Sequence, residues 1–383
     1  MEGSMERPVF QPTGTPVMDL DTPALVVDLD VMDRNIETLH SRFDQSTAKI
    51  RPHVTGHQTP KIAHRQLQAA NTVGGISVTT VGEAQVFSGA GITDIFVASQ
   101  IVTRSKISRL CTLAGSNRIG VAVDNPQNVS DLSQAATAQG VTLGVLVELD
   151  VGLGRCGVAP GGEAVELSKA VSRSPGLRFD GIMAIAPMPS SSGEVSDGPS
   201  FPDRQERDAT SWRVLQHVLD TRQLIEKAGL PVSVVSVGGT HNYDIAAGMA
   251  GITEIQAGSY PLMDHLYCRL RPEFNPAAKI LAAVISRPTG ESAVLDAGHK
   301  ATGPDRGLAV LDGVAGAKAV RFSAEHGVLD LQTGPAQNIK AGDKAWLVPY
   351  DLGLCFNQYD YVRAVRGDKL EGFWPIAGRG RFD

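Results

Sequence analysis

The sequence predicts a (β/α)8 barrel followed by an all-β domain. Up to residue 268, apolar strand-like segments alternate with helix-like segments, which is typical of a parallel sheet covered by helices. After residue 269, short strand-like segments are separated by Gly, Pro or Asp turns, and helical periodicity is nearly absent. A doubly wound open sheet is the competing interpretation, and it is weaker because no G-x-G-x-x-G motif follows the first strand.

The barrel is expected over residues 21–268, after a flexible N-terminal segment at residues 1–20 that is polar and rich in Pro and Gly. Eight strands and their helices fit the size of a closed barrel. The expected strands are 49–53, 75–79, 94–98, 118–123, 142–149, 178–184, 232–237 and 253–257. The expected helices are 31–43, 59–70, 82–90, 105–114, 127–139, 162–173, 205–228 and 242–248.

The all-β domain is expected over residues 269–383, and the sequence leaves open whether residues 21–28 pair with it. Its expected strands are 277–286, 292–295, 307–311, 320–323, 327–330, 344–347 and 361–365. In the barrel, a long loop at residues 187–203 carries many Ser, Pro and Gly residues. Because structureless loops of this length are uncommon in compact domains, we expect a lid over the barrel mouth.

Bulk composition excludes several classes of protein. A formal net charge of −6 argues against a nucleic-acid partner. No apolar run reaches the roughly 18 residues that a membrane helix needs, and no signal pattern opens the chain, so we expect a cytoplasmic protein. The four cysteines lack C-x-x-C spacing, which favours reduced thiols over a zinc site.

Candidate functional residues follow the predicted strands, because the site of such a barrel lies at the C-terminal ends of its strands. These residues are His53, Thr55 and His57 after the first strand, Glu148, Asp150 and Arg155 after the fifth, Gly238-Gly239-Thr240-His241 after the seventh, and Gly258-Ser259-Tyr260 after the eighth. The loops after strands seven and eight have the small residues that let backbone N–H groups approach a phosphate. Taken together they predict a phosphate site, although either loop alone is also typical of an ordinary turn.

The run from Val147 to Val158 places an Arg after acidic residues and a Gly-rich turn. Arg155 would bond a ring nitrogen or a substrate carboxylate. The alternative, an ion pair between Arg155 and Asp150 with a structural role, is equally consistent with the sequence.

Several motifs distributed over most of the chain belong together. They are Asp21-Thr22-Pro23, Arg51-Pro52-His53, Thr80-Val81-Gly82-Glu83-Ala84, Asp150-Val151-Gly152, Arg155-Cys156-Gly157, Gly238-Gly239-Thr240, Ala257-Gly258-Ser259-Tyr260 with Met263-Asp264, Leu295-Asp296-Ala297-Gly298 with Lys300, and Trp374-Pro375-Ile376. With them the chain resembles the D-threonine aldolase and D-serine dehydratase family. That resemblance implies an alanine racemase-like barrel, a following β domain and a homodimer.

The resemblance also implies a chemistry. Members of the family use pyridoxal 5′-phosphate (PLP), usually with a divalent metal, to cleave or dehydrate β-hydroxy-D-amino acids. Carried over to this sequence, the residues that would bind the cofactor phosphate are Gly239, Thr240, Gly258, Ser259 and Tyr260. Arg155 would lie near the pyridine ring.

Two departures from the family pattern bear on the reaction. Thr55 stands where the family has the lysine that holds PLP, and a hydroxyl cannot form the imine. Asp351 and Gly353 stand at the family's metal-ligand positions, so no divalent metal is expected there. Gly56 and Gln58 depart as well, which indicates natural divergence.

Other residues would have to supply the chemistry. His53 or His57 would act as a general base near neutral pH, and we expect Asp351 and Cys355 to face the barrel mouth. His53, His57 and Asp351 would also suffice for a replacement metal site, while Thr55 fills the space of the lysine. Lys61 and Lys300 are the alternatives for an imine.

Three functions remain open from the sequence. The first is a lyase acting on a small β-hydroxy amino acid or related compound, with PLP bound non-covalently or not used. The second is a PLP-independent enzyme that uses His53, Thr55, His57, Arg155 and Asp351 on a phosphorylated or carboxylated small molecule. The third is a non-catalytic protein that binds PLP or another ligand.

Overall fold

The chain forms two compact units. The β unit consists of Met1–Arg34 and Leu262–Ile376, and the barrel unit consists of Asn35–Pro261 and Ala377–Asp383. The computed structural model describes residues 11–188, 194–195, 198–303, 307–332 and 334–383. Each unit is considered by itself.

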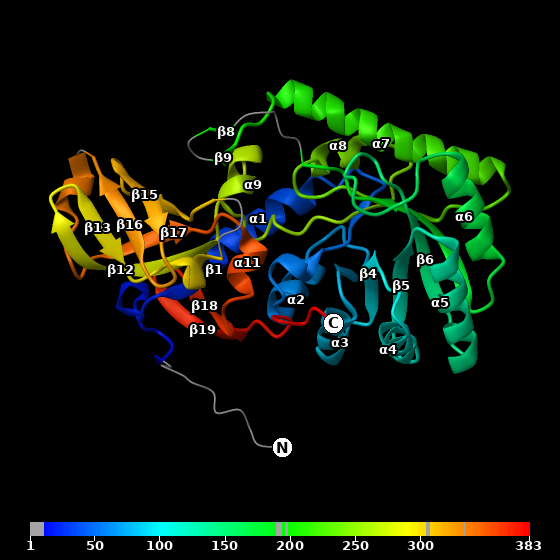
Figure 1. The fold of residues 1–383 in the computed structure, drawn as a ribbon, viewed down its shortest axis with the longest axis horizontal. Helices are drawn as coiled ribbons and strands as arrows, with labels where there is room; N and C mark the ends of the chain where they lie inside the picture. The colour runs from blue at the N-terminus through cyan, green and yellow to red at the C-terminus, as the bar shows by residue number, and fades with distance from the viewer. Residues whose placement is uncertain (1–10, 189–193, 196–197, 304–306, 333) are drawn as a thin grey trace, which may run out of the picture. The chain divides into compact units, whose positions relative to one another are not determined.

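Eight parallel strands form the sheet of the barrel unit, in the order β2-β11-β10-β7-β6-β5-β4-β3 (Figure 1). Each of them overlaps one of the predicted strands. Their bounds are β2 (Lys49–Ile50), β3 (Ile76–Val78), β4 (Asp94–Gln100), β5 (Arg118–Val123), β6 (Leu143–Glu148), β7 (Leu177–Ala184), β10 (Val234–Val237) and β11 (Glu254–Ile255).

Hydrogen bonds between the chain around β2 and the chain around β3 close this sheet. The N–H of Ser77 donates to the carbonyl of Pro52 at 2.8 Å, and the N–H of Val73 donates to the carbonyl of Ile50 at 3.0 Å. His53 and Ser77 form a parallel bridge. The predicted (β/α)8 architecture is therefore confirmed.

Helices lie between successive strands and surround the sheet (Figure 1). Several helices begin with residues that favour a helix start. Pro60 and Pro126 lie in the first turn of their helices, and the side chains of Thr80, Asn125 and Asp203 accept hydrogen bonds from N–H groups of the first turn. Their bounds are α1 (Leu29–Ser41), α2 (Pro60–Gln68), α3 (Val81–Gly89), α4 (Arg104–Ala114), α5 (Pro126–Gln139), α6 (Gly162–Ser172), α7 (Arg204–Lys227) and α8 (Tyr243–Gly248). A 3-10 turn, η2 (Val54–Gly56), follows β2.

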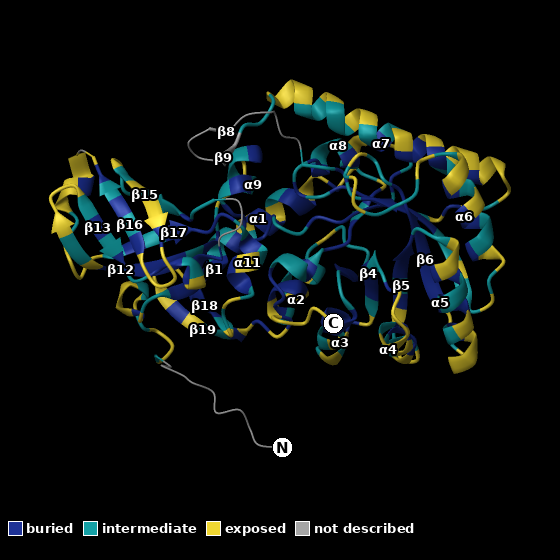
Figure 2. Ribbon diagram, in the orientation of Figure 1, coloured by how far each residue is buried: buried dark blue, intermediate teal, exposed yellow. Residues whose placement is uncertain are grey.

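The barrel strands are apolar because both of their faces are covered. Every residue of β6 is buried, and Figure 2 shows β6 in the buried colour while α4, α5 and α7 expose their outer sides. Side chains from neighbouring strands pack together in a cluster of Phe96, Ala98, Ala122, Leu146 and Met183. Burial of each large apolar side chain contributes roughly 1.5–3 kcal/mol.

The β unit contains a nine-stranded sheet with the path β15-β16-β13-β12-β1-β18-β19, in which β17 also pairs with β12 and β14. The strands are β1 (Ala24–Asp28), β12 (Ala278–Thr289), β13 (Ser292–Leu295), β14 (Val310–Asp312), β15 (Ala317–Phe322), β16 (Gly327–Leu331), β17 (Lys344–Val348), β18 (Tyr361–Arg366) and β19 (Lys369–Pro375). The short helices are α9 (His265–Leu270), α10 (His299–Thr302), α11 (Leu352–Phe356), η1 (Val17–Asp19) and η3 (Gly334–Asn338).

The strand near the N-terminus belongs to this sheet. β1 pairs antiparallel with β12 and parallel with β18, which answers the question that the sequence left open for residues 21–28. Of the predicted flexible segment, residues 1–10 lie outside the described residues. The described part is attached to the sheet, since Gly14 N–H donates to the carbonyl of Leu370 and Leu20 is fully buried.

Three further segments differ from the prediction or fall outside it. β19 was not predicted, because it contains Gly372 and Pro375, residue types that are typical of turns. Residues 377–383, predicted in the β domain, belong to the barrel unit. Of the predicted lid, residues 189–193 and 196–197 lie outside the described residues, and β8 (Glu194–Val195) pairs antiparallel with β9 (Gly198–Pro199). The lid stays a prediction.

Among the helices that the structure describes, none combines the length and apolar character that crossing a bilayer requires.

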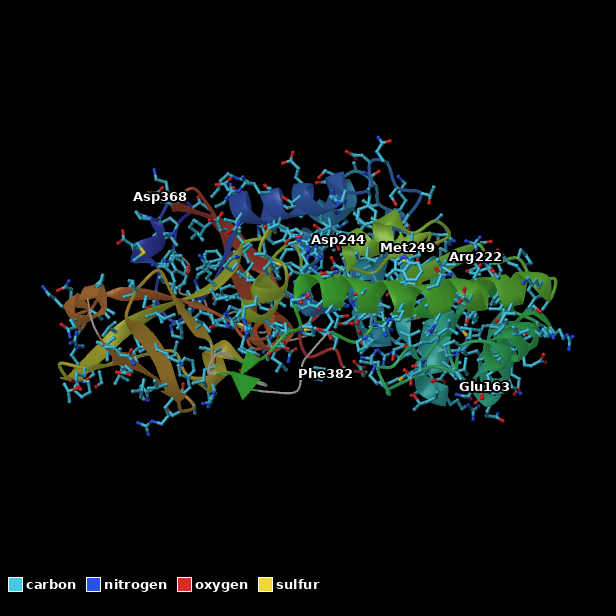
Figure 3. All side chains as sticks on the ribbon, turned by 90° about the horizontal axis from the view of Figure 1, so that it is seen from above. Glu163, Arg222, Asp244, Met249, Asp368 and Phe382 are labelled. Atoms are coloured by element: carbon cyan, nitrogen blue, oxygen red, sulfur yellow. The ribbon has the colours of Figure 1, made fainter. Side chains whose placement is uncertain are left out.

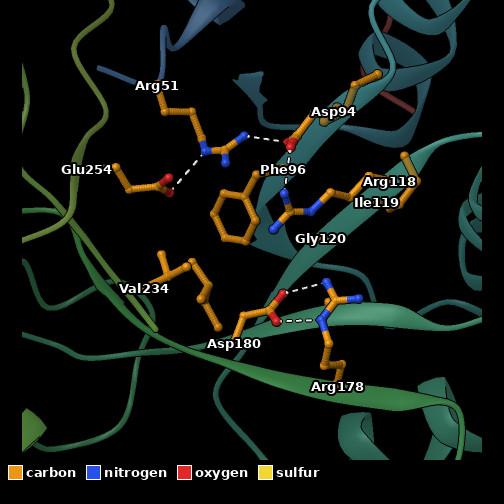
Figure 4. Close-up of a pocket in the computed structure, with 13 residues that line it drawn as sticks. Arg51, Asp94, Phe96, Arg118, Ile119, Gly120, Arg178, Asp180, Val234 and Glu254 are labelled. Carbon is orange, nitrogen blue, oxygen red and sulfur yellow. Dashed lines mark hydrogen bonds and ion pairs between the residues drawn. The ribbon is translucent and has the colours of Figure 1, made fainter. Parts of the chain in front are cut away.

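The arginine of the Arg-Pro-His run lies at the N-terminal end of the barrel strands, away from the end where its histidine lies. Arg51 Nε donates to Glu254 Oε1 at 2.9 Å, and Nη1 donates to Asp94 Oδ1 at 2.7 Å (Figure 4). Arg118 pairs with the other Asp94 oxygen at 3.2 Å. With the Arg178–Asp180 pair, these side chains line a pocket of about 30 Å³, room for roughly one or two water molecules.

This network has a structural role, because the N-terminal face of such barrels carries stability rather than chemistry. The side chains of Arg51 and Glu254 are only 8% and 5% exposed. Loss of one partner therefore leaves a buried charge uncompensated, which costs about 3–5 kcal/mol.

We expect Arg51→Met to lower the thermal unfolding midpoint by roughly 5–15 °C. The matched control is Arg118→Met, because the Arg118 side chain is 63% exposed and pairs with the same aspartate. It should move the midpoint by only about 1–3 °C. Equal small shifts in both variants would contradict a buried structural pair.

Candidate active site

Within the barrel unit, the residues that the sequence predicts as site residues lie at or after the C-terminal ends of the strands. Residues from five βα loops contribute. They are His53 and Thr55 after β2, Thr79 and Glu83 after β3, Glu148 and Arg155 at and after β6, Gly239 and Thr240 after β10, and Gly258, Ser259 and Tyr260 after β11.

Thr55 is held by a buried glutamate. Its Oγ1 donates to Glu83 Oε2 at 2.9 Å and lies 3.0 Å from Thr79 Oγ1. The same Glu83 oxygen accepts the N–H groups of Thr79 at 2.8 Å and Thr80 at 3.3 Å. Gln58 Nε2 donates to the other oxygen at 3.4 Å. Donors from two loops therefore converge on one carboxylate.

Glu83 also forms the capping box of α3, in which Thr80 Oγ1 accepts the Glu83 N–H at 3.1 Å. The side chain is buried, and this burial raises the pKa of Glu83 above its ordinary value despite the hydrogen bonds that act in the opposite direction. The sequence analysis did not name Glu83 as a site residue. The Thr-x-x-Glu pattern at Thr80 was the available signal, and it indicated only a helix start.

Both ring nitrogens of His57, the second histidine predicted as a base, take part in hydrogen bonds next to α2, and its role as a base stays a prediction. Its Nδ1 accepts the N–H of Thr59 at 3.1 Å, so the proton lies on Nε2, which donates to Gln66 Oε1 at 3.0 Å. Burial is the main cause that lowers the pKa of His57 to about 4. Both ring nitrogens are used to hold the start of α2, and no lone pair is left for a substrate.

His53 is better placed for chemistry. Its backbone N–H donates to the carbonyl of Ala257 at 3.0 Å, which fixes the residue between the first and last strand ends. Burial and, after it, the nearby positive charge of Arg155 lower the pKa of His53 to about 4. The imidazole is therefore neutral at neutral pH, and its ring is half-buried.

Arg155 does not pair with Asp150, which removes the structural alternative. Asp150 Oδ1 accepts the N–H groups of Gly152 at 2.9 Å and Gly154 at 3.1 Å, so this carboxylate shapes its own turn. The charge of Arg155 acts on His53 and on Glu148, a buried residue whose pKa is raised by burial. Gln100 donates a hydrogen bond to Glu148. An exposed guanidinium, a neutral imidazole and a buried carboxylate thus come together.

The two predicted phosphate loops meet at one hydroxyl. Thr240 Oγ1 accepts the backbone N–H groups of Ser259 at 3.1 Å and Tyr260 at 3.2 Å. β10 and β11 pair directly, which brings the two loops side by side. Both N–H groups are paired with the hydroxyl, so an anion at these loops would have to replace Thr240 as their acceptor.

Glycine is required at one position of these loops. A Cβ on Gly258 would lie 2.6 Å from the carbonyl oxygen of His53, which is too close for any side chain. At Gly239 the nearest atom to an added Cβ would be His241 Nδ1, at 3.4 Å. The Gly239 N–H donates to Asn242 Oδ1 at 3.0 Å.

The phenol of Tyr260 points into the protein interior. His40 Nδ1 lies 2.6 Å from the carbonyl of Ala70, so it carries the proton, and His40 Nε2 accepts from the Tyr260 hydroxyl at 2.9 Å. Tyr260 is fully buried. Its contribution to a phosphate site is therefore limited to its backbone N–H.

Asp351 and Cys355 belong to the β unit, whereas the other candidates belong to the barrel unit. Asp351 caps α11 by accepting the N–H of Leu354 at 3.0 Å. Asp264 accepts the N–H of Leu352 at 3.3 Å, and burial, with Asp351 nearby, raises the pKa of Asp264 to about 7. Burial raises the pKa of Cys355. The roles expected of Asp351 and Cys355 stay predictions.

No set of three or more His, Cys, Asp or Glu side chains suited to a metal ion occurs among residues 11–383 outside the gaps.

The alternative lysines lie elsewhere. Lys300 is exposed and pairs with Glu325 at 2.5 Å in the β unit, and Lys61 is exposed in the first turn of α2. Lys49 opens β2 at the opposite end of the barrel and donates to Asn71 at 2.8 Å. In the described part of the barrel unit, no lysine follows a strand at its C-terminal end.

We expect Gly258→Ala to destabilise the protein by about 1–3 kcal/mol, because the new methyl group meets the backbone of His53. Gly239→Ala is the matched control, since its nearest contact is an ordinary one and less than about 0.5 kcal/mol should be lost. Thermal unfolding of the two variants measures the difference. A tolerated Gly258→Ala would show that the two loops are looser than described.

Two family models match the chain. Alanine racemase, N-terminal domain, matches residues 27–264, and Putative serine dehydratase domain matches residues 277–365. Their order agrees with the predicted barrel and β domain.

Individual relatives match nearly the whole chain. A D-threonine aldolase from Arthrobacter sp is 34% identical and covers 97% of this chain and 96% of its own. A 3-hydroxy-D-aspartate aldolase from Paracoccus denitrificans is 33% identical over 95% of this chain and 93% of its own. The crystal structure of D-threonine aldolase from Filomicrobium marinum has a TM-score of 0.91 at 34% identity and covers 97% of this chain and 100% of its own. The chain therefore belongs to the family of D-threonine aldolase and 3-hydroxy-D-aspartate aldolase, with an alanine racemase-type barrel followed by a serine dehydratase-like domain.

Proposed function

We propose that the protein is a lyase that cleaves a small β-hydroxy amino acid, or a related compound, without a lysine-bound cofactor. Membership of a family of aldolases and dehydratases supports the substrate class. The hydrogen bond from Thr55 to Glu83 supports the lack of a lysine-bound cofactor. It places a hydroxyl in a buried polar network where the family pattern has an amine.

The residues present suit the phosphate group of PLP but not its covalent attachment. The family uses this cofactor, which supplies an electron sink when it is bound as an imine. Thr240 and the N–H groups of Ser259 and Tyr260 suit its phosphate. Thr55 and its hydrogen-bond partners Thr79 and Glu83 offer hydroxyls and a carboxylate, which form no imine, so the usual covalent attachment of PLP does not fit this position. We infer that any PLP held here is bound non-covalently.

The side chains at the mouth match the groups of a β-hydroxy amino acid. The exposed guanidinium of Arg155 would bind the carboxylate. The buried carboxylate of Glu148 would bind the ammonium group, and its position near Arg155 sets these two groups of the substrate side by side. The hydroxyl would then face His53.

The state of His53 favours aldol cleavage over dehydration. A neutral imidazole accepts the β-hydroxyl proton, the carbon–carbon bond breaks as the aldehyde forms, and the electron pair left at the α-carbon takes back the proton from the imidazolium. Arg155 would stabilise that charge. Dehydration instead needs a proton donor for the departing hydroxide, and a ring with a pKa of about 4 is a poor one at neutral pH.

The non-catalytic interpretation is supported by one observation. Thr55 and its neighbours donate hydrogen bonds to Glu83, so the position offers no reactive group.

Incubation with D-threonine or 3-hydroxy-D-aspartate, with and without added PLP, separates a lyase from a non-catalytic protein. Aldol cleavage releases glycine or a related amino acid together with an aldehyde, whereas binding without turnover favours the non-catalytic interpretation. Turnover of a phosphorylated or carboxylated compound that lacks the amino group would favour His chemistry without PLP.

The homodimer and the cytoplasmic location expected from the sequence stay proposals. Sedimentation of the purified chain tests the first, and a single-copy mass would contradict it.

We expect the acid limb of the pH profile of kcat/KM to fall at about pH 4 instead of near 6.5, the ordinary value for histidine. Above this pH the ring is neutral and accepts a proton, and below it the ring is charged and inactive. Arg155→Gln should move the limb upward, because it removes the smaller of the two causes of the lowered pKa. Circular dichroism across the same range checks that the fold persists, and an unshifted limb near pH 6.5 would argue against His53 as the base.

We expect wild-type protein mixed with PLP to show no visible absorption band that survives dialysis and is trapped by borohydride. Thr55→Lys should gain such a band, because it restores an amine at the end of the first strand. Thr55→Arg is the matched control, since it adds a positive charge that forms no imine. A trapped band in the wild type would place the imine on another lysine.

A further inference from the structure

The last seven residues of the sequence contact the chain around Thr55. Gly378 N–H donates to the carbonyl of Gln58 at 2.9 Å. Thr80 Oγ1 donates to the carbonyl of Arg381 at 2.6 Å, and Gly82 N–H donates to an oxygen of Asp383 at 2.5 Å. Figure 1 shows this end of the chain beside α3. We call residues 377–383 the strap.

Glycine allows a close approach between the strap and the barrel at two points. A Cβ on Gly82 would lie 2.7 Å from Asp383 Oδ1 and 2.9 Å from the Asp383 backbone oxygen, so the strap would have to move. A Cβ on Gly378 would lie 3.1 Å from the carbonyl oxygen of Gln58, a tight contact that a small shift would have to relieve. Neither glycine has a positive φ that would require glycine for another reason.

The end of the strap lies at the start of a helix. Gly82 is in the first turn of α3, where backbone N–H groups have no partner within the helix, so Asp383 satisfies one of them. Arg109 Nη1 pairs with Asp383 Oδ2 at 2.8 Å. Phe382, labelled in Figure 3, is 68% exposed. The polar contacts, and not burial of the one large apolar side chain, hold the strap.

Two of the residues to which the strap is attached, Gln58 and Thr80, are partners of Glu83. Gln58, whose carbonyl accepts from Gly378, also donates its side-chain amide to Glu83. Thr80, which donates to Arg381, accepts the Glu83 N–H with the same hydroxyl. Gln58 has a φ of +52°, an unfavourable value for a residue with a side chain, so its backbone needs external support.

We propose that the strap is a positioning segment of the candidate site. It holds Gln58 in its unfavourable conformation and fixes the first turn of α3, and the two together keep Glu83 against Thr55. Hydrogen bonds and an ion pair join the strap to Gln58, Thr80, Gly82 and Arg109, which are not among the predicted catalytic residues. Only the expected change in PLP affinity, described below, rests on the proposed function.

The test compares strap variants with a pair elsewhere in the barrel unit. Asp383→Asn and Gly378→Ala weaken the two ends of the strap separately. Lys169→Gln is the matched control, because Lys169 forms an exposed pair with Glu166 at 2.8 Å on α6. Amide hydrogen exchange is measured at residues 55–58 and 80–83, and the dissociation constant is measured for PLP as a probe.

We expect exchange at both segments to speed up about tenfold in the strap variants and to stay unchanged in Lys169→Gln. The affinity for PLP should fall about three- to tenfold. Exchanging the charges, with Arg109→Asp and Asp383→Arg together, should restore most of the protection, whereas Arg109→Asp alone should not. A general loss of stability would speed up exchange everywhere and would not be rescued in this way.

Unchanged exchange at 55–58 in Gly378→Ala, or equal exchange in a chain that ends at Ile376, would overturn the proposal. Absence of PLP binding in the wild type would count against the cofactor part of the proposed function only. The exchange measurement needs no ligand, so the two failures are distinguishable.

Discussion

The carboxylate of Glu83 is the interaction on which the arrangement of the site depends. It accepts hydrogen bonds from Thr55, Gln58 and two backbone N–H groups, and its own N–H completes the cap of α3. Because a buried carboxylate is costly without such donors, the two loops that carry them are fixed relative to each other. The same glutamate would stand beside an amine at position 55 in place of the hydroxyl.

Neighbouring charges give the mouth of the barrel its chemical character. Arg155 acts on His53 and on Glu148, so its charge adds to burial, the main cause of the lowered pKa of His53, and lies near a buried carboxylate. His53 follows β2, whereas Glu148 and Arg155 lie at and after β6, and combining groups from different strands is how one barrel architecture supports several reactions. His57, further along the chain, is fully buried with both ring nitrogens bonded next to α2, whereas His53 is only half-buried.

Much of the architecture is predictable because it rests on local patterns. The strands of the barrel are apolar along their length, and Pro60 and Pro126 mark helix starts. The pairing of β1 with β12 is not predictable in this way, since the partners are about 250 residues apart and any apolar strand would satisfy the pattern. The strap is missed for a different reason: a Gly- and Arg-rich run has no periodicity, and its hydrogen bonds use backbone atoms.

The site is predictable as a set of positions and much less as a set of roles. Strand ends identify His53, Thr55, Arg155 and Thr240 as neighbours, because parallel strands all end at the same rim. The position of a residue at a strand end does not predict the direction in which its side chain points. Tyr260 and Arg51 show the limit: the phenol of Tyr260 is bonded to His40 in the interior, and Arg51 reaches the opposite end of the barrel.

The hydroxyl of Thr240 has a consequence for selectivity. An anion that binds the N–H groups of Ser259 and Tyr260 has to replace this hydroxyl as their acceptor. The free energy of binding is therefore the difference between the hydrogen bonds to the anion and those to Thr240. Chloride or a single carboxylate, weakly attracted, would recover little from that exchange. A doubly charged oxyanion recovers more, since charge-assisted hydrogen bonds are roughly twice as strong as neutral ones. If these loops bind an anion, the threonine would compete with it for the two N–H groups and would favour a doubly charged oxyanion over a singly charged one.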